Sequence, residues 1–434
     1  MTDPPFMQHN REKNTDLSET TTSVVVPERL VQGGAALVRT SSGVVFVDGA
    51  LPGERVRIGP VSRVRGAPQA ELLEILEPSP YRRKPECPLF GACGGCDWQY
   101  LEYSEQIRWK QEILAENLRR LGSVEIPTDS IAVISGAEYG YRSRVQVHPT
   151  EAGTAGFRRR LSNETIPVSH CPVATPLIND QLLRMSGHSS GDKVSHSEAV
   201  TPLRSRTVLV ERDHGVAVGG VDPVAEISVN GGSVRFDPAG FAQSNRGLLP
   251  ELSRRLQQAY LGGPLVDLYA GAGLLTVMTL AEAPARDATP PGIICVEPDR
   301  RNARFIPNNL AVRGYTGTVQ VVGTTAERAV AALPLKKVTD SRTTVVVDPP
   351  RGGLSKAVTQ WLTGAGTRRA APAAIAPVAA RVIYVSCDAA ALARDVGRLR
   401  AAYTLRELTL VDFYPQTAHI EALAILDRRE DQSL

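Results

Sequence analysis

The stretch that decides the fold is Val382-Ile-Tyr-Val-Ser386-Cys387-Asp388, an apolar run that stops at a cysteine and is followed by the helical pattern 389–396. An apolar run of this length is typical of a buried strand. Open α/β sheets carry out their chemistry at the carboxyl ends of such strands. We therefore expect a thiol at a strand end, so Cys387 is either a packed cysteine or a candidate nucleophile.

Outward from this strand, apolar runs and helical patterns alternate through the last third of the chain. The alternation predicts an α/β fold with a parallel, doubly wound sheet. The last two strands are joined without a helix, which predicts an antiparallel edge hairpin. The expected strands are Pro264–Leu268, Gly292–Glu297, Val319–Val322, Thr343–Asp348, Val382–Ser386, Leu405–Asp412 and His419–Leu426.

A glycine-rich turn follows the first of these strands and opens a helix. In Asp267-Leu-Tyr269-Ala-Gly271-Ala-Gly273 the glycines let a nucleotide approach the backbone. Thr276 stands where a dinucleotide-binding motif needs a third glycine, which disfavours NAD. Glu297 closes the next strand, where an acidic side chain suits the two hydroxyls of a ribose. Together these residues predict a nucleoside-containing ligand.

Two more carboxylates stand at strand ends. Asp348-Pro349-Pro350-Arg351 ends one strand with a rigid, extended turn that holds Asp348 at the edge of the sheet. Amino-methylating enzymes place an aromatic residue after such a Pro-Pro pair, whereas this chain has Arg351. Glu421 is the lone carboxylate in the otherwise apolar strand Ile420–Leu426, where it is either a paired structural acid or a base whose pKa burial raises.

Six cysteines in a chain for which we expect no secretory signal favour metal binding or catalysis over disulfides. Four of them lie in the first half, and glycines between two of these allow both thiolates to face one centre. A thiolate quartet suits either zinc or an iron–sulfur cluster, and the spacing does not choose between them. The four candidate ligands are Cys87, Cys93, Cys96 and Cys171.

The first part of the chain predicts a tail and a barrel. Residues 1–22 are polar and without periodicity, which predicts disorder. Five short β runs over 23–80 predict a small barrel of a type that often binds oligonucleotides. Ser104–Leu121 predicts a helix with Ser104 as its N-cap, and a β-rich middle region is expected from Ile131. The alanine- and proline-rich runs 282–291 and 364–380 are expected to be surface insertions.

Composition narrows the class of protein and its partners. The net charge is only +3, yet arginines alternate with aromatic residues around Arg142 and Arg144 and again at 157–160, a mixture suited to RNA phosphates and bases. A solvated basic face is the alternative for each cluster. The longest weakly polar stretch, 370–385, is interrupted by prolines and an arginine, so no membrane span is expected. We expect a cytoplasmic protein.

The motifs occur together in the order found in the RNA uridine-5-methyltransferases, which this chain resembles over about residues 24–428. The resemblance implies a TRAM barrel over 23–80, a central domain over 81–245 that holds a [4Fe-4S] cluster on the four cysteines, and a class I S-adenosylmethionine methyltransferase domain over 246–434. It places the helix 104–121 against the methyltransferase domain. It also implies a cofactor site formed by Gln243, Tyr269, Gly271, Gly273, Glu297 and Asp348.

The resemblance implies a covalent mechanism. Cys387 adds to C6 of a uridine, C5 takes the methyl group, and Glu421 removes the C5 proton. The chain departs from the family at Asp388, Leu274 and Ala242, which stand where Asn, Asn and an aromatic are common. None of these changes removes a group that the mechanism needs.

RNA is the expected partner, and 23S ribosomal RNA is favoured over transfer RNA because a separate RNA-binding barrel suits a large structured target. A monomer is expected. Two other classes stay open: a DNA or protein amino-methyltransferase, which would not need Cys387, and a non-catalytic RNA-binding protein that carries the cluster.

Overall fold

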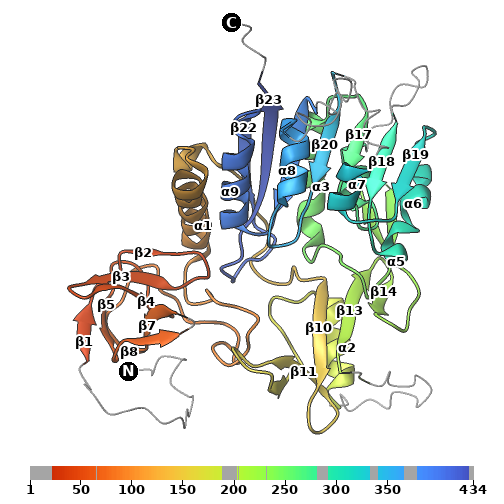
Figure 1. The fold of residues 1–434 in the computed structure, drawn as a ribbon. Helices are drawn as coiled ribbons and strands as arrows, with labels where there is room; N and C mark the ends of the chain where they lie inside the picture. Colours follow the sequence, from red (N-terminus) through yellow and green to blue (C-terminus); the bar gives the residue numbers. More distant parts are fainter. Residues whose placement is uncertain are drawn as a thin grey trace, which may run out of the picture.

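The computed structural model describes residues 22–64, 66–187, 203, 205–230, 232–280, 292–332, 341–365 and 379–429. A barrel-like module and a small β-rich module lie at one end, and a large sheet flanked by helices lies at the other (Figure 1). The predicted disordered tail lies outside the described residues apart from residue 22. The insertion predicted at 282–291 lies wholly outside them, and most of that at 364–380 does too.

The large sheet has eight strands and contains the stretch that opened the sequence. β21 (Arg381–Ser386) pairs in parallel with β20 (Thr344–Val347) and antiparallel with β23 (Glu421–Arg428). The full order is β19-β18-β17-β20-β21-β23-β22-β9. The predicted doubly wound α/β class is confirmed. The remaining strands are β17 (Leu265–Asp267), β18 (Ile293–Val296), β19 (Val319–Val322), β22 (Tyr403–Val411) and β9 (Ala132–Ile134).

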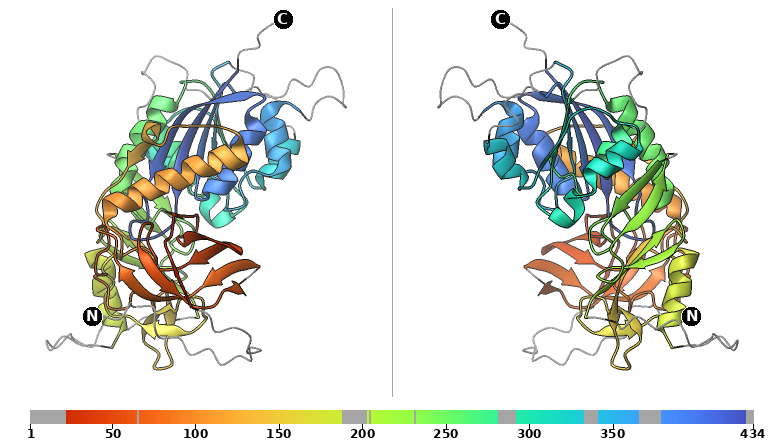
Figure 2. Two further views of the ribbon diagram at one scale, coloured as in Figure 1. Left: turned by 90° about the vertical axis from the view of Figure 1, so that its left-hand side faces the viewer. Right: turned by 90° about the vertical axis from the view of Figure 1, so that its right-hand side faces the viewer.

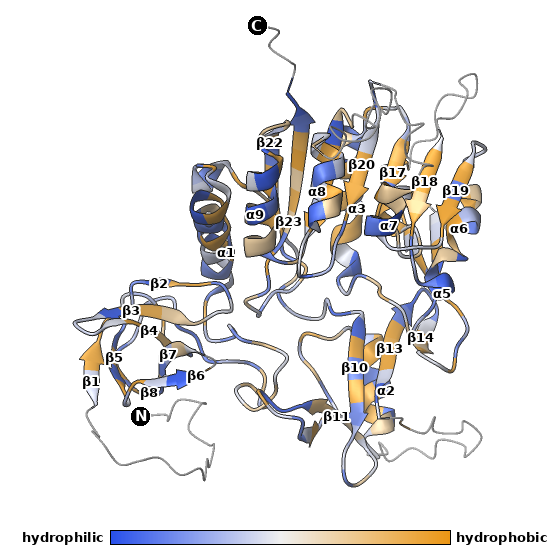
Figure 3. Ribbon diagram, in the orientation of Figure 1, coloured by the Kyte–Doolittle hydropathy of each residue, from blue (hydrophilic) through white to orange (hydrophobic). Residues whose placement is uncertain are grey.

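Helices bury both faces of this sheet, so its central strands β20 and β21 are buried along their whole length and mostly apolar (Figure 3). Successive residues of a strand point to opposite faces. Val345 and Val347 therefore join the core beneath one set of helices, and Val346 joins the core beneath the other. The first set is α1 (Tyr103–Asn117), α7 (Ala326–Ala331), α8 (Lys356–Thr363) and α9 (Ala389–Leu399), and the second is α3 (Leu249–Ala259), α4 (Leu274–Thr279) and α6 (Ile306–Val312).

Two predictions about the rim of the sheet are wrong. The final hairpin is not at the edge, because β23 lies between β21 and β22, and β9 pairs in parallel with β22 outside it. β9 begins the segment that was assigned to the β-rich middle region. It joins the large sheet because Thr409, Leu410 and Val411 of β22 offer it a free side for pairing. A three-residue strand carries too little pattern to reveal such a partner.

Helix α1 links the N-terminal modules to the large sheet (Figure 2). It begins at Tyr103 with Glu102 as N-cap, so the prediction that Ser104 is the cap is wrong. It continues into a π-helical turn, η1 (Leu118–Gly122), that packs against α9. A Cβ on Gly122 would lie 2.7 Å from the carbonyl oxygen of Ala393, so only glycine allows this approach.

The N-terminal module has eight short strands where five were expected. Several are only two to four residues long, which is too short for an alternating pattern to appear in the sequence. One sheet has the order β1-β5-β8 and the other β2-β3-β4-β7-β6. Their bounds are β1 (Ser23–Val25), β2 (Arg29–Leu30), β3 (Ala36–Thr40), β4 (Gly43–Val47), β5 (Arg55–Ile58), β6 (Ser62–Val64), β7 (Ala67–Ala70) and β8 (Leu72–Glu77).

The β-rich module between barrel and sheet contains one five-stranded antiparallel sheet, a two-stranded hairpin and α2 (Pro176–Met185). Among the described helices, none is long and apolar enough to cross a membrane. The sheet comprises β12 (Thr165–Pro167), β11 (Ala155–Arg158), β10 (Arg144–Pro149), β13 (Thr207–Arg212) and β14 (Gly215–Val218), and the hairpin comprises β15 (Ala225–Val229) and β16 (Gly232–Phe236).

Candidate active site

Cys387 and Glu421 lie at the same edge of the large sheet. The last pair of the antiparallel ladder between β21 and β23 is Ser386 opposite Ala422. Cys387 follows Ser386, and Glu421 precedes Ala422, so both stand one position beyond that pair. Glu421 is buried, with 4% of its surface exposed, whereas Cys387 is half-buried. The sheet thus brings together a reachable thiol and a buried carboxyl group.

The parallel strands add two more carboxyl groups at this edge. Asp267 is the last residue of β17, and Asp348 follows β20, which pairs in parallel with both β17 and β21. Asp267 is fully buried and accepts a hydrogen bond from the hydroxyl of Thr276 at 2.7 Å. Carboxyl ends of parallel neighbours meet at one edge, so Asp267, Asp348 and Cys387 lie side by side.

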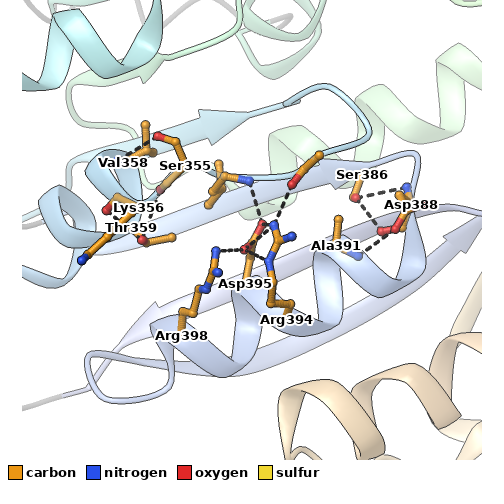
Figure 4. A network of polar contacts seen from close by, with 12 residues as sticks. Ser355, Lys356, Val358, Thr359, Ser386, Asp388, Ala391, Arg394, Asp395 and Arg398 are labelled. Carbon is orange, nitrogen blue, oxygen red and sulfur yellow. Dashed lines mark hydrogen bonds and ion pairs between the residues drawn. The ribbon is translucent and has the colours of Figure 1, made fainter.

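A buried aspartate of α9 holds the loop that follows Asp348 (Figure 4). Asp395 accepts hydrogen bonds from the backbone N–H of Leu354 at 2.7 Å and from the hydroxyl of Tyr384 at 3.0 Å. The neighbouring Arg394 donates to the carbonyl of Gly352 at 2.7 Å. These bonds fix the chain at Gly352 and Leu354, where the turn after the two prolines ends.

The segment after Cys387 is also fixed. The side chain of Asp388 caps α9 by accepting a hydrogen bond from the N–H of Ala391 at 2.7 Å, and the hydroxyl of Ser386 accepts one from the N–H of Asp388 at 3.3 Å (Figure 4). The other carboxylate oxygen of Asp388 accepts a hydrogen bond from the Gln32 side chain at 2.9 Å. Gln32 belongs to the barrel, so the barrel reaches within one residue of Cys387. Sequence analysis did not predict this contact.

Burial and mutual repulsion set the charges of the three central groups. Burial and then the charge of Asp267 raise the pKa of Asp348 to about 7. Burial and then Asp348 raise the pKa of Glu421 to about 8. Burial, followed by Glu421 and Asp348, raises the pKa of Cys387 to about 11, while Arg351 opposes that rise. The site therefore favours a protonated thiol beside carboxyl groups that change charge near neutral pH, as expected of an acid–base site.

The predicted nucleoside-binding residues lie along the same edge. Gly271 has φ +55° and Gly273 has φ +87°, both in the left-handed region that favours glycine. The carboxylate of Glu297 accepts hydrogen bonds from the N–H of Gly271 at 2.8 Å and of Asp299 at 2.7 Å. Each oxygen keeps a second lone pair, so Glu297 braces the glycine turn and can still accept from two hydroxyls.

Gln243 and Tyr269 complete the predicted cofactor side. The side-chain oxygen of Gln243 is buried, and no donor within the described part of the chain reaches it. A buried acceptor without a donor is costly, which fits a ligand that supplies one. Tyr269 is half-buried at the start of the glycine turn, and its N–H donates to Asp267 at 3.2 Å. Both residues fit a site for a nucleoside with polar substituents.

Tyr414 and Arg351 are neighbours of Cys387 to which sequence analysis assigned no role. Tyr414 is half-buried, and its ring packs edge-on against His419. Burial raises the pKa of the Tyr414 hydroxyl, and the charges of Glu421 and Cys387 add to that rise. Arg351 is exposed and contributes positive charge near Cys387. The sequence contains both within recognisable motifs, but only the fold reveals what they face.

The four cysteines from the first half of the chain line one cavity of about 430 Å³. Burial raises the pKa of Cys93 to about 11 and that of Cys96 to about 12. Backbone N–H groups donate to Cys87, Cys93 and Cys171, and the Gln99 side chain bonds Cys96, and these bonds oppose the rise. No three His, Cys, Asp or Glu side chains of the described chain are arranged to hold a single metal ion.

The chemistry of this donor set suits a thiolate-bound metal centre. All four sulfurs face one space, each with a nearby hydrogen-bond donor, as is usual for iron–sulfur ligands. A Cβ on Gly94 would lie 3.4 Å from the carbonyl oxygen of Arg158, and one on Gly95 would lie 3.5 Å from the sulfur of Cys93, both ordinary van der Waals distances. The four cysteines therefore form a chemically suitable candidate cluster site.

The structure corrects the prediction that Arg142 and Arg144 form a phosphate-binding face. Arg142 lines the cysteine cavity, where its charge lowers the pKa of Cys96 and Cys171. Arg144 donates to the carbonyl of Gly240 at 2.9 Å. Buried thiols that can ionise provide a reason to bury a guanidinium group. In the second cluster Arg160 pairs with Asp97 at 2.7 Å, whereas Arg158 is exposed.

Comparison with known proteins agrees with this geometry. Residues 324–429 match the family model described as tRNA (Uracil-5-)-methyltransferase. The solved structure of a Pyrococcus abyssi tRNA (uracil-54, C5)-methyltransferase in complex with S-adenosyl-L-homocysteine has a TM-score of 0.68 and 20% identity. It covers 93% of this chain and 99% of its own. The shared fold is that of a class I methyltransferase with β-rich N-terminal modules.

Full-length relatives narrow the assignment. An RNA methyltransferase of Streptomyces avermitilis, described as uncharacterized, is 31% identical over 92% of this chain and 96% of its own. A 23S rRNA (uracil(1939)-C(5))-methyltransferase of Alkalilimnicola ehrlichii is 30% identical over 91% of this chain and 94% of its own. The fold and site thus define an RNA methyltransferase. Within that class, the chain belongs to the RNA (uracil-5-)-methyltransferase family.

Proposed function

We propose that the chain transfers a methyl group from S-adenosylmethionine to C5 of a uridine in structured RNA through a covalent adduct on Cys387. The observation that carries this proposal is the placement of Cys387 and Glu421 side by side at the end of one ladder, next to Asp348. A thiol beside a buried base is the pair that covalent activation of uracil requires.

The proposed steps follow from the chemistry of uracil. C5 is a poor nucleophile until a thiolate adds to C6, so Cys387 would form the C6–S bond first and make C5 carbanion-like. The carbanion-like C5 would then attack the electrophilic methyl group that bound S-adenosylmethionine supplies; the C5–CH3 bond forms, the S–CH3 bond breaks, and S-adenosylhomocysteine leaves. Glu421 would then take the C5 proton, the C–H electrons would form the C5–C6 double bond, and the C6–S bond would break to return the thiolate to Cys387.

The cofactor would lie along the strand ends from β17 to β20. Glu297 would accept from the ribose hydroxyls, the turn at Gly271 and Gly273 would face the amino-acid end, and Gln243 would accept a hydrogen bond for its buried oxygen. Asp348 would face both cofactor and uracil. These roles need backbone and carboxylate groups that other contacts already hold in place.

We also propose a [4Fe-4S] cluster on Cys87, Cys93, Cys96 and Cys171, with a structural or RNA-positioning role because the methylation chemistry moves no electrons. Support comes from the common cavity, the donors near each sulfur and the half-buried Arg142 beside them. Anaerobically purified protein should contain about four irons and four sulfides per chain. Colourless protein that contains zinc would overturn the cluster and leave the methylation proposal intact.

Among RNA substrates, we favour 23S ribosomal RNA over transfer RNA. The 30% identical relative named for 23S rRNA aligns over more than nine-tenths of both chains. A barrel in front of the catalytic domain suits a large folded RNA, from which a base must leave its stack at a cost of a few kcal/mol. Deleting the gene should remove 5-methyluridine from 23S rRNA. Loss from transfer RNA alone would contradict this choice.

One experiment separates the proposed function from its alternatives. The protein is incubated with S-adenosylmethionine labelled in the methyl group and with total RNA, and the nucleosides are then analysed. We expect labelled 5-methyluridine with wild-type protein and none with Cys387→Ala. Retained transfer by that variant to another acceptor would indicate an amino-methyltransferase. No transfer by wild-type protein that still binds RNA would indicate a non-catalytic RNA-binding protein.

A further inference from the structure

The loop between β22 and β23, residues 412–420, carries the chain into Glu421. At its centre lies Gln416, a fully buried residue with φ +68°. A residue other than glycine rarely adopts this left-handed backbone conformation, and it does so only where the surrounding contacts stabilise it. The conformation of Gln416 therefore requires an explanation in the contacts around it.

Those contacts use every polar group of Gln416. Its backbone N–H donates to the Gln106 side chain at 2.9 Å, and its carbonyl accepts from the N–H groups of Asp97 and Trp98, each at 3.0 Å. Its side-chain oxygen accepts from Gln106 at 3.0 Å and from Arg83 at 3.1 Å. Its side-chain N–H donates to Glu138 at 3.2 Å. All these partners lie between residues 83 and 138.

The same N-terminal segment holds the loop on both sides of Gln416. Before it, the fully buried Lys110 pairs with Asp412 at 2.7 Å and donates to the carbonyl of Tyr414 at 3.1 Å. After it, the N–H of Ala418 donates to the Asp97 carboxylate at 3.2 Å. Residues outside the large sheet thus determine the conformation of this loop, and the last of these contacts, at Ala418, is three positions before Glu421.

We propose that Gln416 is the positioning residue for the catalytic base: it fixes the loop in the single conformation that presents Glu421 to the C5 proton. The proposal rests on the proposed function. The proposal predicts that loss of this anchor impairs only the removal of the C5 proton. Formation of the C6–S bond by Cys387 and methyl transfer to C5 precede proton removal, so they should survive when the loop loses its anchor.

The test uses Gln416→Gly in the full-length protein. Glycine accepts the left-handed backbone without strain but removes every side-chain bond of Gln416. We expect kcat to fall by about tenfold or more, while the affinity for S-adenosylhomocysteine changes less than about twofold. Because proton removal becomes slow, a denaturation-resistant complex of protein with methyl-labelled RNA should accumulate on a gel.

A second variant tests the anchor without changing the loop. Gln106→Ala removes two bonds to Gln416 and should produce the same labelled adduct to a smaller extent. The matched control is Gln111→Ala on the same helix, whose side chain bonds the carbonyl of Ile131. This control should turn over like wild type. Glu421→Gln, which removes the base itself, sets the maximum adduct.

The outcomes separate this inference from the function on which it rests. If wild-type protein transfers no methyl group to RNA, the proposed function fails. If wild-type protein is active and both variants turn over normally without adduct, Gln416 does not position the base. Loss of adduct together with turnover, with cofactor binding retained, would assign Gln416 a structural role and overturn the proposal.

Discussion

Cys387 and Glu421 stand side by side, each one position beyond the final ladder pair of β21 and β23, in which Ser386 faces Ala422. The two strands run in opposite directions, so one residue leaves the sheet at the edge where the other enters it. Charge repulsion from Glu421 contributes to the raised pKa of Cys387. Backbone pairing of the two strands thereby holds the thiol and the carboxyl group at one edge of the sheet.

Replacing the nucleophile should abolish methylation and leave cofactor binding intact. With Cys387→Ala we expect no labelled 5-methyluridine, because the uracil C5 cannot be activated without the thiolate. Wild-type protein should form a stable complex with RNA that contains 5-fluorouridine, since fluorine replaces the proton that Glu421 must remove. Full activity in the alanine variant would exclude the covalent mechanism.

The rate of turnover should increase with pH through the range set by Glu421. Burial and Asp348 raise the pKa of Glu421 to about 8, and only the ionised carboxylate can accept the C5 proton. The pH profile of the single-turnover rate constant for release of methylated RNA should therefore have its acidic limb near that value. Asp348→Asn removes the repelling charge and should shift the limb to lower pH. An unchanged limb would mean that another group acts as the base.

Glu421 should also lower the free energy of unfolding at alkaline pH. In the unfolded chain Glu421 ionises near its ordinary pKa of 4.5, whereas in the folded chain it stays protonated until about pH 8. The unfolded state thus binds fewer protons between these values, so stability falls as pH rises. Glu421→Gln should raise the melting temperature at pH 8 and change it little at pH 4. Equal effects at both pH values would contradict the assignment.

Removing Glu297 should weaken cofactor binding in two ways. Glu297→Ala removes the acceptor proposed for the ribose, and it frees the N–H of Gly271 that shapes the glycine turn. We expect the affinity for S-adenosylhomocysteine to fall by about tenfold or more in calorimetry. The control Glu251→Ala removes an exposed carboxylate on α3 that pairs with arginines of its own helix. Undiminished affinity in Glu297→Ala would place the ribose elsewhere.

The barrel should act on RNA through its contact with the segment after the nucleophile. Gln32→Ala breaks the bond to Asp388, which we expect to raise the KM for RNA by about three- to tenfold while leaving kcat and cofactor affinity unchanged. Gln69→Ala on β7, a half-buried glutamine of the same barrel, is the matched control. Deleting residues 1–78 should weaken RNA binding further. Equal KM values for both glutamine variants would show that Gln32 does not help to position the RNA.

The sequence by itself determined the features that follow from the residue pattern of short segments: the strands, their ends and the order of the motifs. An apolar run that ends in a cysteine predicts a strand end, and repetition of strand and helix predicts parallel pairing, so Cys387, Asp348 and Glu297 were expected at one edge of a sheet. The order of the motifs indicated the family. These predictions needed only the spacing of side chains along short segments.

The tertiary structure decided which distant residues meet. Gln32 touches Asp388 across 356 positions, Gln106 holds Gln416 across 310, and β9 joins a sheet whose other strands begin more than a hundred residues later. It also turned Arg142 toward the thiols rather than toward solvent. Local periodicity specifies which face of an element is apolar, but not which polar group from another module completes its hydrogen bonds. Those partners are selected only when the modules pack and each buried donor must find an acceptor.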